Sequence, residues 1–273
     1  DGKMPKDLKK LGAAEIALIR EWIAQGAKTA RSEPESPDAV LITAEERNFW
    51  AFQPIKNPPV PEGVKNPIDA FLLRKLKTKG LGFAAAADKR TLIRRATFDL
   101  TGLPPTPEEV AAFLTDQSPS GFAEVIDRLL HSPRYGERWG RHWLDVARYA
   151  ESTGRSVNFL LNHAWRYRDY VIQAFNENMP FDQFTREQLA GDLLLQPTQR
   201  QIIATGYNRL NKTTEEGGAQ PGEYLTKYAA DRVRTTAGTW LGLTLGCCEC
   251  HDHKYDPFTT KDFYRFVACF ADI

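Results

Sequence analysis

The chain has 273 residues, of which 42% are hydrophobic and 26% charged, and its formal net charge at pH 7 is +1. This is an ordinary globular balance with enough apolar material for a real core, and a charge so close to zero provides no basic surface for nucleic acid. The longest uncharged apolar stretch, residues 235–248, is shorter than the roughly 20 residues that cross a bilayer, so we predict no membrane span.

The N-terminal part of the chain begins with Asp1 rather than Met and shows no export leader, so we expect a mature or partial chain. Apolar residues recur at helical spacing over residues 13–25 and predict an amphipathic helix that ends at Gly26. Residues 27–38 are rich in Ser, Pro, Glu and Lys, which is typical of a linker.

The rest of the chain favours helices throughout. A Pro-rich stretch leads to Asn66 as N-cap with Pro67 in the first turn, and Thr106 caps a later helix in the same way. No convincing run of alternating strand residues appears, so we predict an all-α fold with long irregular loops, distinct from a small stand-alone cytochrome c fold. We expect helices over residues 67–78, 89–99, 107–114, 122–130, 137–150, 164–176, 181–194, 199–208, 223–245 and 261–270.

Two of these expected helices carry further patterns. In residues 137–150, Trp139, Trp143 and Val146 fall on one face, with His142 next to that stripe. In residues 223–245 and just beyond, glycines recur every fourth residue. Such a row leaves one helix face flat, so that another backbone or the plane of a haem can approach it closely. The last expected helix runs close to Ile273 without a stop signal, so we expect a domain truncated at its C-terminal end.

The stretch with the clearest chemistry is Cys-x-x-Cys-His, formed by Cys247, Cys250 and His251. This spacing is a signature of covalent c-type haem attachment, because two thiols three residues apart can each bond one haem vinyl group. The adjacent imidazole then lies beneath the iron as its proximal ligand. We therefore predict haem c, with His251 as the metal-binding residue.

Other chemistry is open to the same residues. A zinc site would use Cys247, Cys250 and His251 with His253 or Asp256, and a redox-active dithiol would use the two cysteines alone. A disulfide would include the extra thiols, Cys248 within the motif or Cys269 beyond it.

The partner of His251 across the iron is the open part of the predicted haem site. The candidates are His142, His163 and Met179, with His131 less favoured because it precedes Pro133 in an expected turn. Two strong protein ligands favour electron transfer, whereas an open position lets a small molecule bind. Arginines that are candidates for pairing with haem propionates are Arg148, Arg166, Arg168, Arg232 and Arg234.

One acidic pair is a separate candidate. Glu215 and Glu216 precede two glycines in an expected loop, where paired carboxylates can bind calcium or act as acid and base. An ordinary solvated loop accounts for the same residues.

Four long phrases resemble one known family: FDLTGLPPTPEEVAAFL from Phe98, RHWLDVARYAESTG from Arg141, AWRYRDYVIQAFNENMPFDQFTREQLAGDLL from Ala164 and TWLGLTLGCCECHDHKYDP from Thr239. They are similar to the planctomycete-type cytochrome c family, in which a cytochrome c domain precedes a domain of unknown function with its own Cys-x-x-Cys-His. The resemblance implies that residues 1–27 end a cytochrome c-like domain with Met4 as its distal ligand. It further implies a Pro-rich linker over residues 28–66 and a helical c-type haem domain over residues 67–273.

The resemblance implies an exported bacterial protein of the periplasm or the extracellular space. We expect electron transfer or a redox enzyme module, with the upstream cytochrome c domain and other redox proteins as partners and polysaccharide as a further candidate. The alternative is a non-haem scaffold, stabilised by zinc or a disulfide, for binding or processing extracellular polysaccharide. A hydrolase that uses Glu215 and Glu216 is a third hypothesis.

Overall fold

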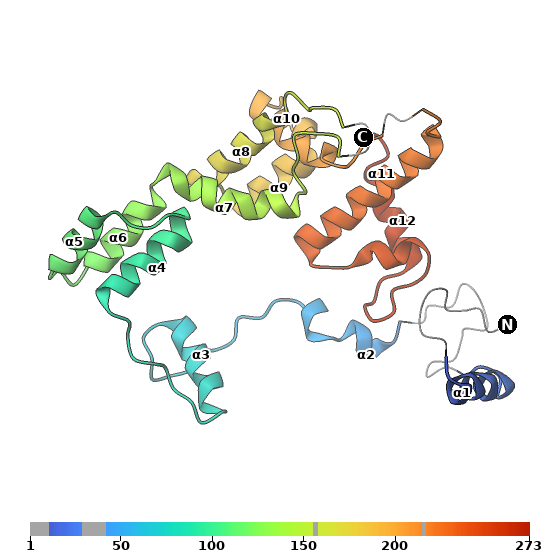
Figure 1. Cartoon of the computed structure of the whole chain (residues 1–273), viewed down its shortest axis with the longest axis horizontal. Helices are drawn as coiled ribbons and strands as arrows, with labels where there is room; N and C mark the ends of the chain where they lie inside the picture. The colour runs from blue at the N-terminus through green and yellow to red at the C-terminus, as the bar shows by residue number, and fades with distance from the viewer. Residues whose placement is uncertain (1–10, 29–41, 155–157, 215–216) are drawn as a thin grey trace. The chain divides into compact units, whose positions relative to one another are not determined.

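The computed structural model describes residues 11–28, 42–154, 158–214 and 217–273, and its regular elements in these ranges are helices joined by irregular segments (Figure 1). Within these ranges no strand occurs, and an isolated antiparallel bridge joins Ser152 to Leu160. The predicted all-α class is therefore confirmed. No helix in the described ranges is long and apolar enough to cross a membrane. Packing divides the chain into two units, residues 1–52 with 255–257, and residues 53–254 with 258–273.

The first unit contains the helix predicted over residues 13–25. That helix ends before Gly26, which has a φ of +85°, and the Trp22 indole N–H donates to the Lys28 carbonyl 2.8 Å away. No residue of its described helices is buried. Met4 lies outside the described residues, so its role as a haem ligand stays a prediction. The helices of this unit are α1 (Ala13–Ala24), α2 (Ala44–Arg47) and η1 (Trp50–Phe52).

The second unit begins with helices whose starts follow from their caps. The Asn66 side chain accepts from the Ile68 N–H at 2.9 Å, as predicted. Thr106 and Glu109 form a capping box, in which each side chain accepts from the other residue's backbone N–H. The fourth helix packs against the three that follow it. These elements are α3 (Pro67–Lys77), α4 (Lys89–Thr101), α5 (Pro107–Thr115) and α6 (Gly121–Leu130).

The next group, α7 to α10, holds the largest core. Helix α7 begins at Pro133 rather than at residue 137, because the Ser132 hydroxyl accepts from the Arg134 N–H and the proline occupies the first turn. Val146, predicted to face inward, is 51% exposed. The residues that α7 buries are instead Gly136, Gly140, Leu144 and the following Ala147. The elements are α7 (Pro133–Val146), α8 (Trp165–Asn176), α9 (Phe181–Ala190), η2 (Gly191–Leu193), α10 (Gln199–Ala204) and η3 (Thr205–Arg209).

Helices α7 and α8 come closest at Gly136. A Cβ atom there would lie 2.3 Å from the Ile172 carbonyl oxygen, and the Gly136 N–H donates to the Asn176 side chain at 2.8 Å. A missing side chain at this point lets the two backbones approach, which is why the buried face of α7 is built on small residues.

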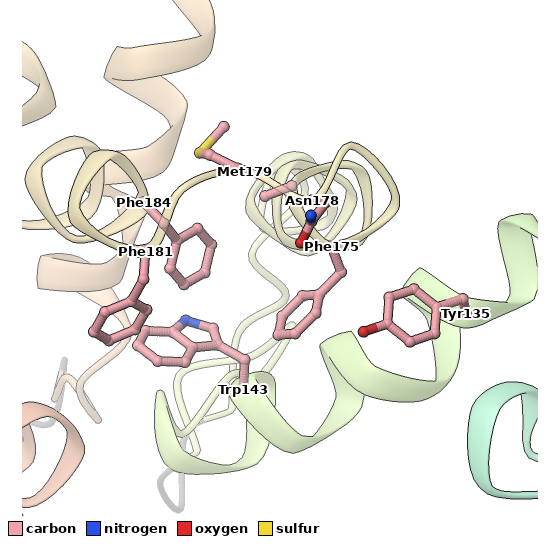
Figure 2. Close-up of a pocket in the computed structure, with 8 residues that line it drawn as sticks. Tyr135, Trp143, Phe175, Asn178, Met179, Phe181 and Phe184 are labelled. Carbon is pink, nitrogen blue, oxygen red and sulfur yellow. The ribbon is translucent and has the colours of Figure 1, made fainter. Parts of the chain in front are cut away.

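Around this contact lies a group of buried residues that we call the aromatic core. It includes Tyr167, Tyr170, Phe184 and Tyr207, with Trp143 packed against them. Figure 2 shows a pocket at its edge, of about 170 Å³, where the side chains of Trp143, Phe184 and other residues surround a small apolar space.

The C-terminal part of the second unit differs from the single helix predicted over residues 223–245. Helix α11 ends at Thr236 and continues as a π-helical turn that Gly242 closes with a φ of +64°. A Cβ atom on Gly238 or Gly242 would meet nothing within 4 Å, so neither glycine lines a close contact. The elements are α11 (Pro221–Thr236), η4 (Ala237–Leu241), η5 (Leu245–Glu249) and α12 (Thr260–Ala268).

We call the buried residues of this part the C-terminal core. It is small and apolar, and it joins α11 and α12 to the short 3₁₀ helix η5. Its members are Ala230, Val233, Ala237, Leu245, Cys248, Phe263 and Phe270.

Candidate cofactor-attachment site

The Cys-x-x-Cys-His motif lies on η5 and the turn that follows it. Cys247 and Cys250 are both exposed, and the Cys250 N–H donates to the Cys247 carbonyl at 3.3 Å. Because a 3₁₀ helix has three residues per turn, side chains three residues apart lie on the same face. Leu245 and Cys248, both within η5, share its buried face, and Cys250 is the residue that ends η5. The turn therefore places two thiols at the surface and one in the core.

Cys248 is fully buried in the C-terminal core. Its sulfur lies 3.5 Å from the Phe258 carbonyl oxygen, and burial raises the pKa of the thiol. Cys269 is exposed at the end of α12, and all four cysteines of the chain are free thiols in the structure. The thiol inside the attachment loop is thus a packing residue, and the surface pair has the spacing expected before His251.

His251 is exposed, and its ring is oriented by the main chain. Its Nδ1 atom lies 2.7 Å from the carbonyl oxygen of Asp252. Because a carbonyl only accepts, this contact calls for the proton on Nδ1 and leaves the lone pair of Nε2 available to a metal. The Asp252 carboxylate accepts from the Thr260 N–H at 2.8 Å, which ties the same residue to the start of α12.

His253 closes the loop after the motif. Its backbone N–H donates to the Phe258 carbonyl at 2.9 Å, and its Nε2 atom lies 3.2 Å from the Thr244 hydroxyl. Among the described residues, no group of three or more His, Cys, Asp or Glu side chains is placed to hold a metal ion. The four-ligand set that a structural zinc ion requires is not assembled here.

A long-range ion pair fixes the outer side of the turn. Glu249, between the two surface cysteines, pairs with Arg234 of α11. The Arg234 side chain crosses Gly246, where an added Cβ atom would lie 3.1 to 3.2 Å from it. Gly246 therefore serves close packing, one of the two roles that the glycine spacing indicated, and its neighbour is an arginine side chain.

The expected partners across the iron lie elsewhere in the second unit. His142 is exposed on α7, and its ring makes a T-shaped contact with Trp139 at 5.3 Å between centroids. His163 lines a cavity of about 640 Å³ over α8 and α10. The Met179 sulfur accepts from the Tyr170 hydroxyl at 3.7 Å. No described contact joins these three residues to the motif, so the distal ligand stays a prediction. Glu215 and Glu216 lie outside the described residues.

A covalently attached haem would need two exposed thiols at this spacing and an imidazole that follows directly. Cys247, Cys250 and the available Nε2 of His251 would supply that donor set. The residues present therefore fit this cofactor. The buried face of the turn could have been predicted from the sequence, because Leu245 and Cys248 are both apolar and three residues apart.

The fold and the motif define an all-helical domain that displays two thiols and an imidazole on one surface turn. The model of the PSCyt2 family, described as a protein of unknown function (DUF1549), matches residues 67–273. The chain belongs to this family. Neither the curated proteins nor the solved structures provide a match.

Proposed function

We propose that this chain is a c-type haem module of an exported electron-transfer protein, with haem bonded to Cys247 and Cys250 and His251 as the proximal ligand. The observation that carries the proposal is that η5 and the residue that ends it expose the two correctly spaced thiols, Cys247 and Cys250, and bury the third, Cys248. A bound haem would supply one-electron exchange at its iron.

The chain's own residues have separate parts in this attachment. Each surface thiol adds across one vinyl double bond, so that the sulfur bonds one carbon and the thiol hydrogen goes to the other. The Asp252 carbonyl keeps the imidazole of His251 in the tautomer that presents Nε2. Cys248 anchors the turn in the C-terminal core and keeps its own sulfur away from the vinyl groups.

Electron transfer suits the exposure of the site better than chemistry in a closed pocket. Cys247, Cys250 and His251 are all exposed, so a haem attached there is accessible to another redox protein. Interfaces between redox partners are small and transient, and a surface cofactor meets that need. We propose the upstream cytochrome c domain as the first partner, and the periplasm or extracellular space as the location, because c-type haem is attached to exported protein.

Expression in a host that matures c-type cytochromes tests the proposal. The chain should acquire a Soret band and a mass increase of one haem that survives denaturation. Cys247→Ser and Cys250→Ser should each lower covalent haem, whereas the matched control Cys269→Ser, at an exposed cysteine outside the motif, should leave it unchanged. A colourless wild-type protein from a competent host would contradict the proposal.

The same geometry supports a second function. Two surface thiols on one 3₁₀ face can also interconvert between dithiol and disulfide. A colourless protein that loses two alkylatable thiols on mild oxidation, with both losses abolished by Cys247→Ser, would favour this thiol module over the haem module.

A further inference from the structure

A hollow of about 670 Å³ lies elsewhere in the second unit, where α4 packs against α6 and α7, and we call it the basic cleft. Three arginines and one aspartate line it. They are Arg94, Arg95 and Asp99 on α4 and Arg138 on α7. The rest of the wall is apolar and consists of Leu92, Ala96, Phe98, Leu100, Phe122 and Ile126.

The charged side chains of the basic cleft have no partners inside the protein. In the part of the chain that the structure describes, no ion pair and no hydrogen bond uses the side chain of Arg94, Arg95, Arg138 or Asp99. Three cations and one carboxylate give the cleft a net charge of +2. Like charges that share a cavity repel one another, so a bound anion would stabilise this arrangement.

Arg138 provides independent evidence for a ligand. Its side chain passes the end of α4, where a Cβ atom on Gly102 would lie 3.0 Å from its Cδ atom. Its Nε atom is buried and donates to no described acceptor. The C-terminal end of a helix favours a nearby cation, but that attraction leaves the Nε donor unsatisfied. A buried donor without an acceptor costs about 1–3 kcal/mol, and more when the group is charged. An anion in the cleft would supply the missing acceptor.

Arg94 is held in position without losing its donors. Its guanidinium carbon lies 4.9 Å from the centroid of the Phe98 ring, which is a cation–π contact. A guanidinium stacked on an aromatic face keeps the N–H groups of its edge free. Phe98 and Phe122 are each 37% exposed, so the cleft presents aromatic surface beside its cations. An organic ligand with an apolar body would cover that surface.

We infer that the basic cleft binds a small organic dianion, a phosphate monoester with an apolar body. A phosphate monoester carries a charge of about −1.5 to −2 at pH 7, which matches the net charge of the cleft. Its three acceptor oxygens suit three arginines that come from two helices, whereas a carboxylate has two oxygens. The inference goes beyond the proposed function and does not depend on haem.

Calorimetric titration of the full chain with phenyl phosphate at fixed salt tests the inference. Inorganic phosphate lacks the apolar body and benzoate lacks the phosphate group. Phenyl phosphate should bind about tenfold more tightly than either, because it alone uses both the arginines and the aromatic wall. No binding of phenyl phosphate, or equal binding of all three probes, would overturn the inference.

Single substitutions locate the binding in the cleft. Arg95→Gln and Arg138→Gln should each weaken phenyl phosphate binding about tenfold, and Asp99→Asn should tighten it because it removes the opposing carboxylate. Arg134→Gln is the matched control, since Arg134 lies one turn before Arg138 on α7 and outside the cleft. The control should change the affinity by less than about twofold, and an effect as large as that of Arg138→Gln would overturn the inference.

Arg138→Lys separates a built site from simple attraction between charges. Lysine keeps the charge but has neither the Nε donor nor the planar fork, so binding should weaken about fivefold. Equal binding by Arg138→Lys and the wild type would show that the cleft only concentrates anions, and would overturn the inference. Thermal unfolding without ligand checks that each variant folds. Arg95 is exposed, so Arg95→Gln keeps the test decisive if substitution of Arg138 unfolds the protein.

Discussion

The aromatic core of α7 to α10 and the C-terminal core of α11, η5 and α12 differ in the kinds of side chain that they bury. The first buries large polar side chains and satisfies them: Gln188 is fully buried and accepts from the Trp143 indole at 2.9 Å and from the Tyr167 hydroxyl at 2.5 Å. The second is small and apolar, and one of its members is the sulfur of Cys248.

The difference distinguishes a core that defines one rigid packing arrangement from a core that supports an exposed turn. A buried polar network defines one arrangement of its members, because each unpaired donor in a core is costly. The C-terminal core holds the inner face of η5 and leaves Cys247 exposed on the outside. The comparison predicts that changes in the first core affect folding, and that changes in the turn affect folding only at its buried positions, Leu245 and Cys248.

The largest effect is expected at Gln188. Gln188→Ala removes the acceptor of the buried Tyr167 hydroxyl, leaves the Trp143 N–H with only its 3.1 Å contact to the Tyr167 oxygen and opens a cavity; a buried unsatisfied group costs about 1–3 kcal/mol. We expect the free energy of unfolding to fall by about 3 kcal/mol in urea titrations. Gln173→Ala, at an exposed glutamine of α8, is the control and should change it by less than about 0.5 kcal/mol. Equal effects would show that the network does not define this core.

An intermediate effect is expected at Cys248. Cys248→Ala removes a buried sulfur from an apolar cluster and should lower the free energy of unfolding by about 1–2 kcal/mol, whereas Cys247→Ala should change it by less than about 0.5 kcal/mol. Since burial raises its pKa, the Cys248 thiol should also be alkylated far more slowly at pH 8 than the surface pair. Rapid, uniform labelling of all cysteines in the folded protein would contradict the buried position.

The smallest effect is expected at the capping box of α5, away from both cores. The pKa of Glu109 is lowered, chiefly by the backbone N–H of Thr106 and also by Arg128. A lowered folded-state pKa means that the stabilisation is present above the ordinary carboxyl value and is lost as pH falls through the folded value.

We therefore expect Glu109→Ala to lower the free energy of unfolding by about 1 kcal/mol at pH 7 and by less at pH 3. Glu108→Ala is the matched control, because Glu108 lies in the same first turn and outside the capping box. A Glu109→Ala effect of the same size at both pH values would assign the loss to packing rather than to the charge.

Helix starts were predictable where the cap and the apolar period agreed. Asn66 and Thr106 cap the helices that their patterns predict, because a cap acts on N–H groups two or three residues away. The start of α7 was missed because Ser132 and Pro133 are as typical of a turn as of a helix start. The π-helical turn after Thr236 was missed for a similar reason, since the glycines there are compatible with helix until Gly242 adopts a left-handed φ.

The sequence by itself determined the helical class, most helix positions, the family and the residues of the attachment motif, because these depend on interactions within a few residues. The tertiary structure decided which cysteine is buried, which nitrogen of His251 is bonded, and which arginines pair with carboxylates of distant segments. These features depend on partners such as Arg148 and Asp231, which lie 83 residues apart and meet only when α7 and α11 are in place. Burial and long-range pairing are properties of the packed chain, and local spacing does not encode them.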